Sequence, residues 1–256
     1  MLVDTFMFYN EYDVLELRLE VLDQYVDRFV LVEAEVNHVG GPKPLYFNEN
    51  KERYAKWLHK IEHIIVKADE APKDENPWTR EKYQRECVLR GLADVPDESI
   101  VMISDVDEIP DLKMVPYEKL PHLITSVHMW MFHYSLDYMF VNEPWFGTVI
   151  TNCELFKRVG PNKLRDNRWK FPVFQWAGWH LSSFGDEKHV LNKMKTFAHA
   201  LDNNGHRHLQ TEGNIKQWIE RGIFVDGKTE LVSRPPEVPL PAPVEVLRRL
   251  NLGKFP

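Results

Sequence analysis

The sequence has few cysteines and no long apolar segment. Cys87 and Cys153 are the only cysteines among 256 residues, too few for a disulfide framework, which fits a reducing compartment. No uninterrupted apolar run approaches the roughly 18 residues of a membrane-spanning helix. The first residues also lack the basic and then apolar segments of a secretory signal peptide. These absences predict a soluble, cytoplasmic protein.

Basic residues are in the minority as well. The chain has 32 Lys and Arg against 39 Asp and Glu, which gives a net charge of −7 at neutral pH. A net negative charge argues against a broad positive surface for a nucleic-acid backbone, so nucleic acid is not an expected partner. The net charge does not exclude a local basic groove. With 43% hydrophobic residues, a chain of 256 residues can bury one sizeable core.

Segments typical of strands and of helices alternate along the first half of the chain. The strand-like segments are 2–9, 29–33, 61–67 and 100–103, and the helix-like segments are 13–26, 52–60 and 77–91. Asn76 and Pro77 have the residue types of a helix N-cap and a first helical position. The alternation predicts an α/β fold, with a mostly parallel central sheet and helices on both of its faces.

The second half of the chain is richer in aromatic residues. Residues 127–140 show no helical period, which predicts antiparallel strands on the acceptor side of a site. Residues 145–157 are expected to add another strand. Asp186 has the residue type of a helix N-cap, and the helix after it is expected to reach Ala200.

The end of the chain differs in composition. Five of the 17 prolines lie in 234–243, which predicts an extended segment packed along the surface. A short amphipathic helix is expected at 244–252. We therefore predict a single domain over residues 1–233, followed by a tail over 234–256.

One motif stands at the end of a predicted buried strand. Residues 99–110 read Ser-Ile-Val-Met-Ile-Ser-Asp-Val-Asp-Glu-Ile-Pro. The apolar run stops at two carboxylates, Asp105 and Asp107, two residues apart. Such a pair at the end of a strand can be directed into one crevice, where a hard divalent cation prefers oxygen ligands. A cation held there could bind a diphosphate.

Three other interpretations of the motif compete with a cation site. An EF-hand loop is excluded because Pro110 stands at its sixth position, where that loop needs glycine. A phosphatase of the aspartyl-phosphate type usually has threonine where this chain has Ile109. A solvated turn after a core strand is the simplest alternative. The motif alone leaves the phosphatase and the turn open.

Several segments of the chain form a recognisable series: 4–11, 16–19, 26–34, 38–47, Trp78, Glu81, Gln84, Arg85, 103–110 and 178–182. Taken in this order, they resemble glycosyltransferase family 17. The resemblance implies a GT-A-like fold, a UDP-sugar donor, a divalent metal such as Mn²⁺ or Mg²⁺, and inversion at the anomeric carbon. It also implies N-acetylglucosamine as the sugar and a glycan or another hydroxyl compound as the acceptor. Animal members are anchored in the Golgi membrane, and a chain without an anchor suggests an enzyme of a bacterium or of a virus-infected cell.

The resemblance assigns the metal and the donor to particular residues. For the metal the expected ligands are Asp105, Asp107 and His180, with Asp105 also placed to meet the donor ribose. For the donor the candidates are Phe8, Asn10, Glu11, Glu33, Lys43 and Arg85. Six of these residues also have simpler interpretations: capping for Asn10 and Glu11, a surface charge for Glu33, a solvated lysine for Lys43, a solvated helix pair with Glu81 for Arg85, and a packed histidine for His180.

The catalytic base is not singled out by the sequence. Inversion in a single displacement needs a carboxylate within reach of the acceptor hydroxyl. Asp186 is our candidate, since inverting enzymes of this kind often place the base in this region, and its simpler interpretation is an N-cap. Its rivals are Glu187, Asp137 and Glu154. A zinc site at His199, His206 and His208 is not favoured, because no Cys or carboxylate stands at a supporting spacing.

Two function classes besides a transferase are compatible with the sequence. A carbohydrate-binding protein on a decayed transferase scaffold would keep the aromatic surfaces but would not need the intact Asp-x-Asp motif. A metal-dependent phosphatase would not bind a nucleotide-sugar. The acceptor itself, whether glycan, lipid, protein or modified nucleobase, stays open.

Overall fold

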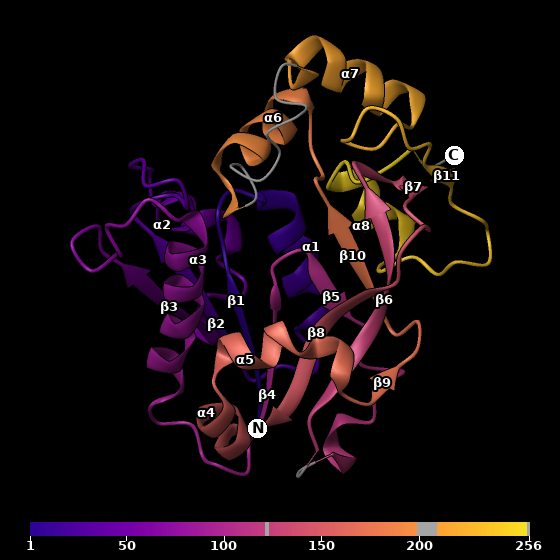
Figure 1. Cartoon of the computed structure of the whole chain (residues 1–256). Coiled ribbons are helices and arrows are strands. Elements are labelled where there is room, and N and C mark those ends of the chain that lie inside the picture. Colours follow the sequence, from indigo (N-terminus) through magenta and orange to yellow (C-terminus); the bar gives the residue numbers. More distant parts are fainter. Residues whose placement is uncertain (121–122, 199–208, 255–256) are drawn as a thin grey trace.

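The computed structural model describes residues 1–120, 123–198 and 209–254 (Figure 1). Its strands are β1 (Leu2–Met7), β2 (Arg28–Ala34), β3 (Ile61–Val66), β4 (Ile100–Asp105), β5 (Glu108–Pro110), β6 (Thr125–His133), β7 (Ser135–Met139), β8 (Trp145–Asn152), β9 (Val173–Phe174), β10 (Gly178–Ser182) and β11 (Val232–Ser233). Its α-helices are α1 (Tyr12–Leu22), α2 (Tyr46–Glu49), α3 (Pro77–Glu86), α4 (Cys153–Val159), α5 (Pro161–Asp166), α6 (Glu187–Thr196), α7 (Glu212–Arg221) and α8 (Val244–Arg249). Within these ranges, no helix is both long and apolar enough to cross a bilayer.

The strands form one mixed sheet in the order β11-β7-β6-β8-β4-β1-β2-β3. The four strands of the first half, β4, β1, β2 and β3, are parallel to one another. From β8 through β6 and β7 to β11 the pairing along this path is antiparallel, while β10 pairs in parallel with β6 and antiparallel with β5. The prediction of an α/β fold with a parallel first part and an antiparallel, aromatic-rich second part is confirmed.

Two hydrophobic clusters cover the two faces of the parallel strands. On one face, Leu15 and Leu19 of α1 belong to the same buried cluster as Phe6 of β1. On the other face, a second cluster contains the valines of β2. It also contains Val88, which follows α3, and Phe156 of α4. Alternate residues of each strand therefore enter different cores, as the two-residue period of a strand requires. The predicted helices on both faces are confirmed.

Several element boundaries differ from the predictions. Residues 52–60 form two short 3-10 segments, Lys51–Tyr54 and Leu58–Lys60, instead of a helix. The strand predicted over 145–157 ends at Asn152, because the Asn152 side chain accepts a hydrogen bond from the N–H of Leu155 and caps α4. The predicted cap at Asn76 is confirmed, since its side chain accepts a hydrogen bond from the N–H of Trp78.

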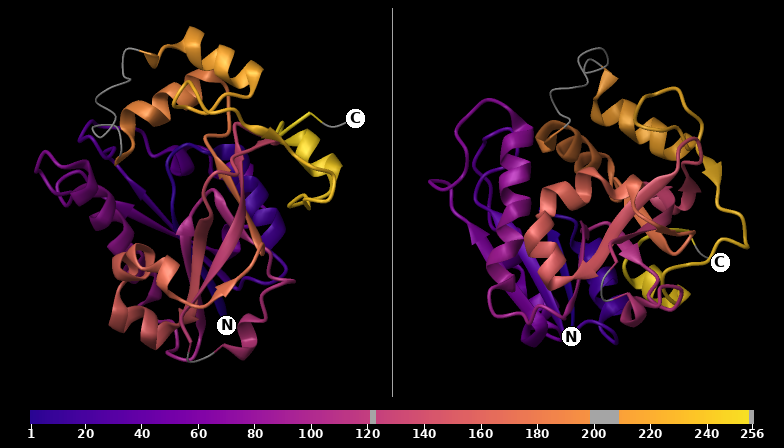
Figure 2. Two further views of the ribbon diagram at one scale, coloured as in Figure 1. Left: turned by 45° about the vertical axis from the view of Figure 1, so that its right-hand side comes forward. Right: turned by 60° about the horizontal axis from the view of Figure 1, so that its bottom comes forward.

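The proline-rich segment and α8 pack against the rest of the molecule. Leu247, Leu250 and Leu252 are buried in the cluster that contains α1. The indole N–H of Trp179 on β10 donates to the carbonyl oxygen of Pro239, at 2.7 Å. Two further helices, α6 and α7, lie together at one end of the molecule (Figures 1 and 2). The division at residue 233 stays a prediction.

A fully buried arginine joins α1 to the loop that follows β4. The Arg18 guanidinium forms a two-point salt bridge with Asp4 of β1, with N–O distances of 2.8 and 2.6 Å. Its Nη2 also donates to Ser104 Oγ, at 2.6 Å. Its Nη1 donates to three main-chain carbonyls of the loop, those of Asp105, Val106 and Glu108. Arg18 thus fixes the backbone that carries the Asp-x-Asp motif.

We expect Arg18→Met to lower the free energy of unfolding by about 3–5 kcal/mol, because Asp4 would be left buried without its partner. Urea denaturation measures this loss. The matched control is Arg248→Met, which removes an exposed arginine of α8 and should be nearly silent. Adding Asp4→Asn to Arg18→Met should recover part of the loss. An unchanged stability in Arg18→Met would contradict the central role of this buried pair.

Candidate active site

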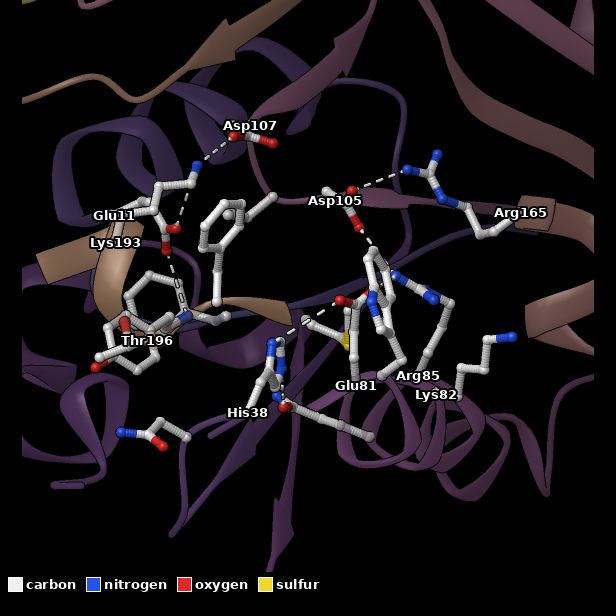
Figure 3. Close-up of a pocket in the computed structure, with 18 of the residues that line it drawn as sticks. Glu11, His38, Glu81, Lys82, Arg85, Asp105, Asp107, Arg165, Lys193 and Thr196 are labelled. Carbon is white, nitrogen blue, oxygen red and sulfur yellow. Dashed lines mark hydrogen bonds and ion pairs between the residues drawn. The ribbon is translucent and has the colours of Figure 1, made fainter. Parts of the chain in front are cut away.

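A pocket of about 690 Å³ opens at the carboxyl ends of the parallel strands. Met7 and Asp105 are the last residues of β1 and β4, and both line the pocket. The other walls come from the segment after β2, from α3, from the α5 region, from β10 and from α6. The carboxyl edge of an open parallel sheet is the usual place for a ligand in such folds. Figure 3 shows part of this lining, with Asp105, Asp107 and several of the charged side chains around them labelled.

Asp105 is held by two arginines (Figure 3). Its Oδ2 lies 2.9 Å from Arg165 Nη2, and its Oδ1 lies 3.8 Å from Arg85 Nη2. Oδ1 accepts no hydrogen bond within the described part of the chain. Burial raises the pKa of the Asp105 carboxyl, but the two arginines outweigh burial and lower the pKa below its usual value. Asp105 is therefore an ionised carboxylate, and one of its oxygens accepts no hydrogen bond from the described residues.

Asp107 has a different cation as its partner. Its Oδ2 accepts a hydrogen bond from Lys193 Nζ of α6, at 3.0 Å, and its Oδ1 lies 3.7 Å from His180 Nε2. Lys193 Nζ also lies 4.0 Å from Glu11 (Figure 3). Burial would raise the pKa of Asp107, but Lys193 and His180 lower it well below its usual range. The predicted ligands Asp107 and His180 are thus neighbours, with an ammonium group already against the carboxylate.

The possible metal ligands form a pair instead of a larger group. Within residues 1–120, 123–198 and 209–254, no three His, Cys, Asp or Glu side chains are grouped so that they could hold a metal ion. Asp107 and His180 suit a cation that takes its remaining ligands from a bound diphosphate and water. Two side chains are too few for a cation whose ligands all come from the protein. The histidines weighed for zinc, His199, His206 and His208, lie outside the described residues.

The residues predicted to bind the donor are divided between the pocket and its supporting layer. Phe8, Glu11 and Lys43 line the pocket, whereas Asn10 and Glu33 are not part of its wall. The Glu33 side chain is fully buried and accepts hydrogen bonds from the N–H groups of Phe47 and Asn48. The interpretation of Glu33 as a surface charge is therefore wrong.

Lys43 is buried against Glu33 instead of being solvated. Its Nζ lies 3.7 Å from Glu33 Oε1, and its side chain is 3% exposed. The same ammonium lies 5.1 Å from the ring centres of Tyr9 and Tyr46. Burial lowers the pKa of Lys43 more than the nearby carboxylates raise it. Two half-buried tyrosine rings and a buried carboxylate thus hold this ammonium in the pocket wall.

The Glu81–Arg85 pair forms part of the pocket wall. Arg85 and Glu81 are 9% and 14% exposed, so the interpretation as a solvated surface pair is wrong. Arg85 Nη1 also donates to Asn162 Oδ1 at the start of α5, at 3.3 Å. His38 Nδ1 lies 3.9 Å from Glu81 on the opposite side. Arg85 is therefore directed from α3 toward the end of β4.

The four candidate bases do not line the pocket. The Asp186 carboxylate accepts a hydrogen bond from the N–H of His189, at 2.8 Å, and caps α6. Glu187 is the first residue of that helix. Asp137 accepts hydrogen bonds from Ser135 and from the N–H of Lys254, and Glu154 pairs with Arg158 on α4. The base role of Asp186 stays a prediction.

Sequence reasoning missed the partners of the Asp-x-Asp motif. Glu108 is fully buried and forms a two-point salt bridge with Arg165, with N–O distances of 2.7 and 2.9 Å. Its Oε1 also accepts the indole N–H of Trp145, at 2.9 Å. Glu108 directly follows the motif. A charged residue just after a core strand is the one sequence signal that could have marked it as a site residue. Nothing in the sequence connects Glu108 with Arg165, because they lie 57 positions apart. Asp107 and Lys193 are even further apart, at 86 positions.

Known sequences resemble much of this chain. The family model described as "Glycosyltransferase family 17" matches residues 1–227. The human β-1,4-mannosyl-glycoprotein 4-β-N-acetylglucosaminyltransferase is 25% identical over 205 residues, which are 68% of this chain and 38% of the human protein. The mouse protein of the same name is 24% identical over the same shares. The chain thus spans well under half of the length of these relatives.

Two solved structures are similar to this chain at a low level. The inositol-1-phosphate CTP transferase of T. maritima has a TM-score of 0.41 and 9% identity, over 75% of this chain and 96% of that one. The glucosyl-3-phosphoglycerate synthase of Mycobacterium tuberculosis, in complex with Mn²⁺, UDP and phosphoglyceric acid, has a TM-score of 0.36 and 15% identity, over 70% of each chain. Scores this low carry no argument about fold or function.

The two roles of Asp186 can be separated by a pair of variants. If Asp186 is only a cap, Asp186→Asn should leave sugar transfer and stability nearly unchanged, because Asn caps as well as Asp. Asp186→Ala should then cost about 1 kcal/mol of stability without abolishing transfer. The cap geometry leads us to expect this pattern. A loss of ~100-fold in transfer by Asp186→Asn, with normal melting temperature, would instead establish the base role.

Proposed function

Because this chain belongs to glycosyltransferase family 17, we propose that it transfers a sugar from a nucleotide-sugar to a hydroxyl group of a glycan or a similar acceptor. We further propose UDP-N-acetylglucosamine as the donor, because the named relatives are N-acetylglucosaminyltransferases. Transfer is proposed to proceed with inversion at the anomeric carbon, in a GT-A-like arrangement. The whole activity is a proposal, since the chain covers only part of its relatives.

The observation that carries this proposal is the set of cations around the end of β4. Arg85, Arg165 and Lys193 approach Asp105 and Asp107 from three separate elements. A nucleoside diphosphate leaves only if the negative charge that develops on it is stabilised. Fixed cations in a partly buried site supply this stabilisation with little rearrangement. The pocket is thus suited to a diphosphate leaving group.

We assign the donor's parts to the wall residues by their chemistry. The side chains after β1 and β2, Phe8, Tyr9 and Lys43, offer apolar and aromatic surface with one cation, which suits a uridine base and its ribose. Asp105 Oδ1 has no hydrogen-bond donor in the described chain and suits a ribose hydroxyl. Glu33 is proposed to act indirectly, by holding Lys43. Asn10 and Glu11 are proposed to support the turn between β1 and α1.

We keep Asp107 and His180 as the proposed ligands of a divalent cation, Mn²⁺ or Mg²⁺. Asp105 is not kept as a ligand, because two arginines hold its carboxylate. When bound, the cation would supply positive charge to the diphosphate oxygens as the bond to the sugar breaks. Lys193 would have to leave Asp107 Oδ2 for this to occur, and it can turn toward Glu11, 4.0 Å away. Asp186 is not kept as the proposed base, because its carboxylate caps α6 and does not line the pocket.

The metal role can be tested by calorimetry of UDP binding. In the native protein we expect Mn²⁺ to strengthen UDP binding at least about tenfold over binding in chelator, and Asp107→Asn to abolish this gain. Lys193→Met should raise the affinity for Mn²⁺ alone, followed by the electron paramagnetic resonance of free Mn²⁺, because it removes the competing ammonium. Asp97→Asn, in an exposed pair with Lys157, is the matched control. Equal UDP affinity with and without chelator in the native protein would refute the metal role.

The role of Arg85 can be tested in the same assay. We expect Arg85→Ala to weaken UDP binding by about 1.5–3 kcal/mol, the range for hydrogen bonds to a charged group. Uridine binding should be unaffected, because uridine has no diphosphate. Arg90→Ala removes a more exposed arginine after α3 that pairs with Glu70, and serves as the control. An unchanged UDP affinity in Arg85→Ala would contradict the donor role and leave this arginine with its protein contacts to Glu81, Asn162 and Asp105. A carbohydrate-binding protein or a phosphatase would show no specific UDP binding at all.

A further inference from the structure

One cation in the pocket wall is not matched by a carboxylate. Each other lysine or arginine that lines the pocket has a salt bridge to a described carboxylate; the pairs are Lys43–Glu33, Lys82–Asp166, Arg85–Glu81, Arg165–Glu108 and Lys193–Asp107. Arg168 also lines the pocket, but it has no salt bridge to any carboxylate of residues 1–120, 123–198 and 209–254. A half-buried charge without a counter-ion is costly unless a ligand supplies one.

The Arg168 guanidinium is held in a fixed orientation. Its Nε donates to the carbonyl oxygen of Phe146, at 2.6 Å, and its Nη1 donates to the carbonyl oxygen of Arg165, at 2.9 Å. Its central carbon lies 5.3 Å from the ring centre of Trp145 and 5.5 Å from that of Trp169. Two main-chain acceptors and two indole rings therefore restrict the side chain. Little conformational entropy is lost when such a group binds a ligand.

Part of its hydrogen-bonding capacity is still available. A guanidinium has five N–H donors, and the contacts to Phe146 and Arg165 use one on Nε and one on Nη1. The N–H groups of Nη2 donate to no residue in the described part of the chain. Burial and the neighbouring Arg165 charge lower the pKa of Arg168, while Glu108 and Asp105 raise it by less. An arginine nevertheless stays protonated.

From this geometry we infer that Arg168 binds an oxyanion, a phosphate or a carboxylate, in the pocket. The planar guanidinium pairs with both groups through parallel N–H···O hydrogen bonds. Within the proposed function, the oxyanion has two sources: the diphosphate of the donor, or a negatively charged group on the acceptor. The naming of these two sources is the part of the inference that rests on the proposed function. The oxyanion site itself follows from the unmatched guanidinium.

The test uses UDP, uridine and inorganic phosphate as probes of the whole chain, with Arg168→Gln as the variant. If the oxyanion is the donor diphosphate, Arg168→Gln weakens UDP binding by at least about tenfold and leaves uridine binding unchanged. If it belongs to the acceptor, UDP binding is unchanged, and phosphate binds to the UDP-saturated native protein but not to the variant. Unchanged binding of both UDP and phosphate in Arg168→Gln overturns the inference.

Two further variants separate binding from folding. Arg158→Gln removes an exposed arginine of α4 and controls for the general loss of one positive charge. Arg168→Lys keeps the charge but not the planar donor set, so it should restore part of the lost affinity, whereas a purely structural role for Arg168 would show the same melting-temperature loss in both variants and no change in affinity. If native protein binds phosphate through Arg168 but does not bind UDP, the oxyanion site stands and the proposed function fails.

Discussion

The buried Arg18–Asp4 salt bridge is the contact on which the rest of the site depends. Arg18 comes from α1 and Asp4 from β1. Arg18 also donates to Ser104 Oγ and to three main-chain carbonyls between residues 105 and 108. A buried ion pair adds little net stability, but removing one partner is expensive. The pair therefore acts mainly by fixing geometry: it ties the first helix, the first strand and the loop after β4 into one unit, so the two aspartates of the motif have defined positions.

A second layer of charge pairs surrounds that loop and divides the motif between two sets of partners. Glu108 and Asp105 share Arg165, and Asp105 is also approached by Arg85. Asp107 belongs instead with Lys193 of α6. The two aspartates thus differ in chemistry although they are two residues apart: one is held by guanidinium groups, the other by an ammonium group that can turn to a second carboxylate. A polyanionic ligand would enter a pocket whose positive charges are already oriented.

Much of the framework could be predicted from the sequence, because it depends on local patterns. The apolar runs at β1, β2 and β4 and the Asn76–Pro77 helix start are properties of neighbouring residues. The errors also have local physical causes. Asn152 caps α4 and ends β8 early, and residues 52–60 make 3-10 segments against the core instead of a regular helix. The solvated interpretations of Glu33, Lys43 and Arg85 failed because exposure depends on which distant segments cover a side chain.

The sequence by itself determined the alternation of strands and helices, the strand that ends in Asp105 and Asp107, and the family likeness. Each of these is written in residues close together in the chain. Only the tertiary structure decided which charges meet: Arg165 comes to Glu108, Lys193 comes to Asp107, and Arg168 is left without a carboxylate. The physical reason is that a salt bridge acts over a few ångströms, whereas these partners are separated by dozens of residues, and only the packing of α5 and α6 over the carboxyl edge of the sheet brings them within that range.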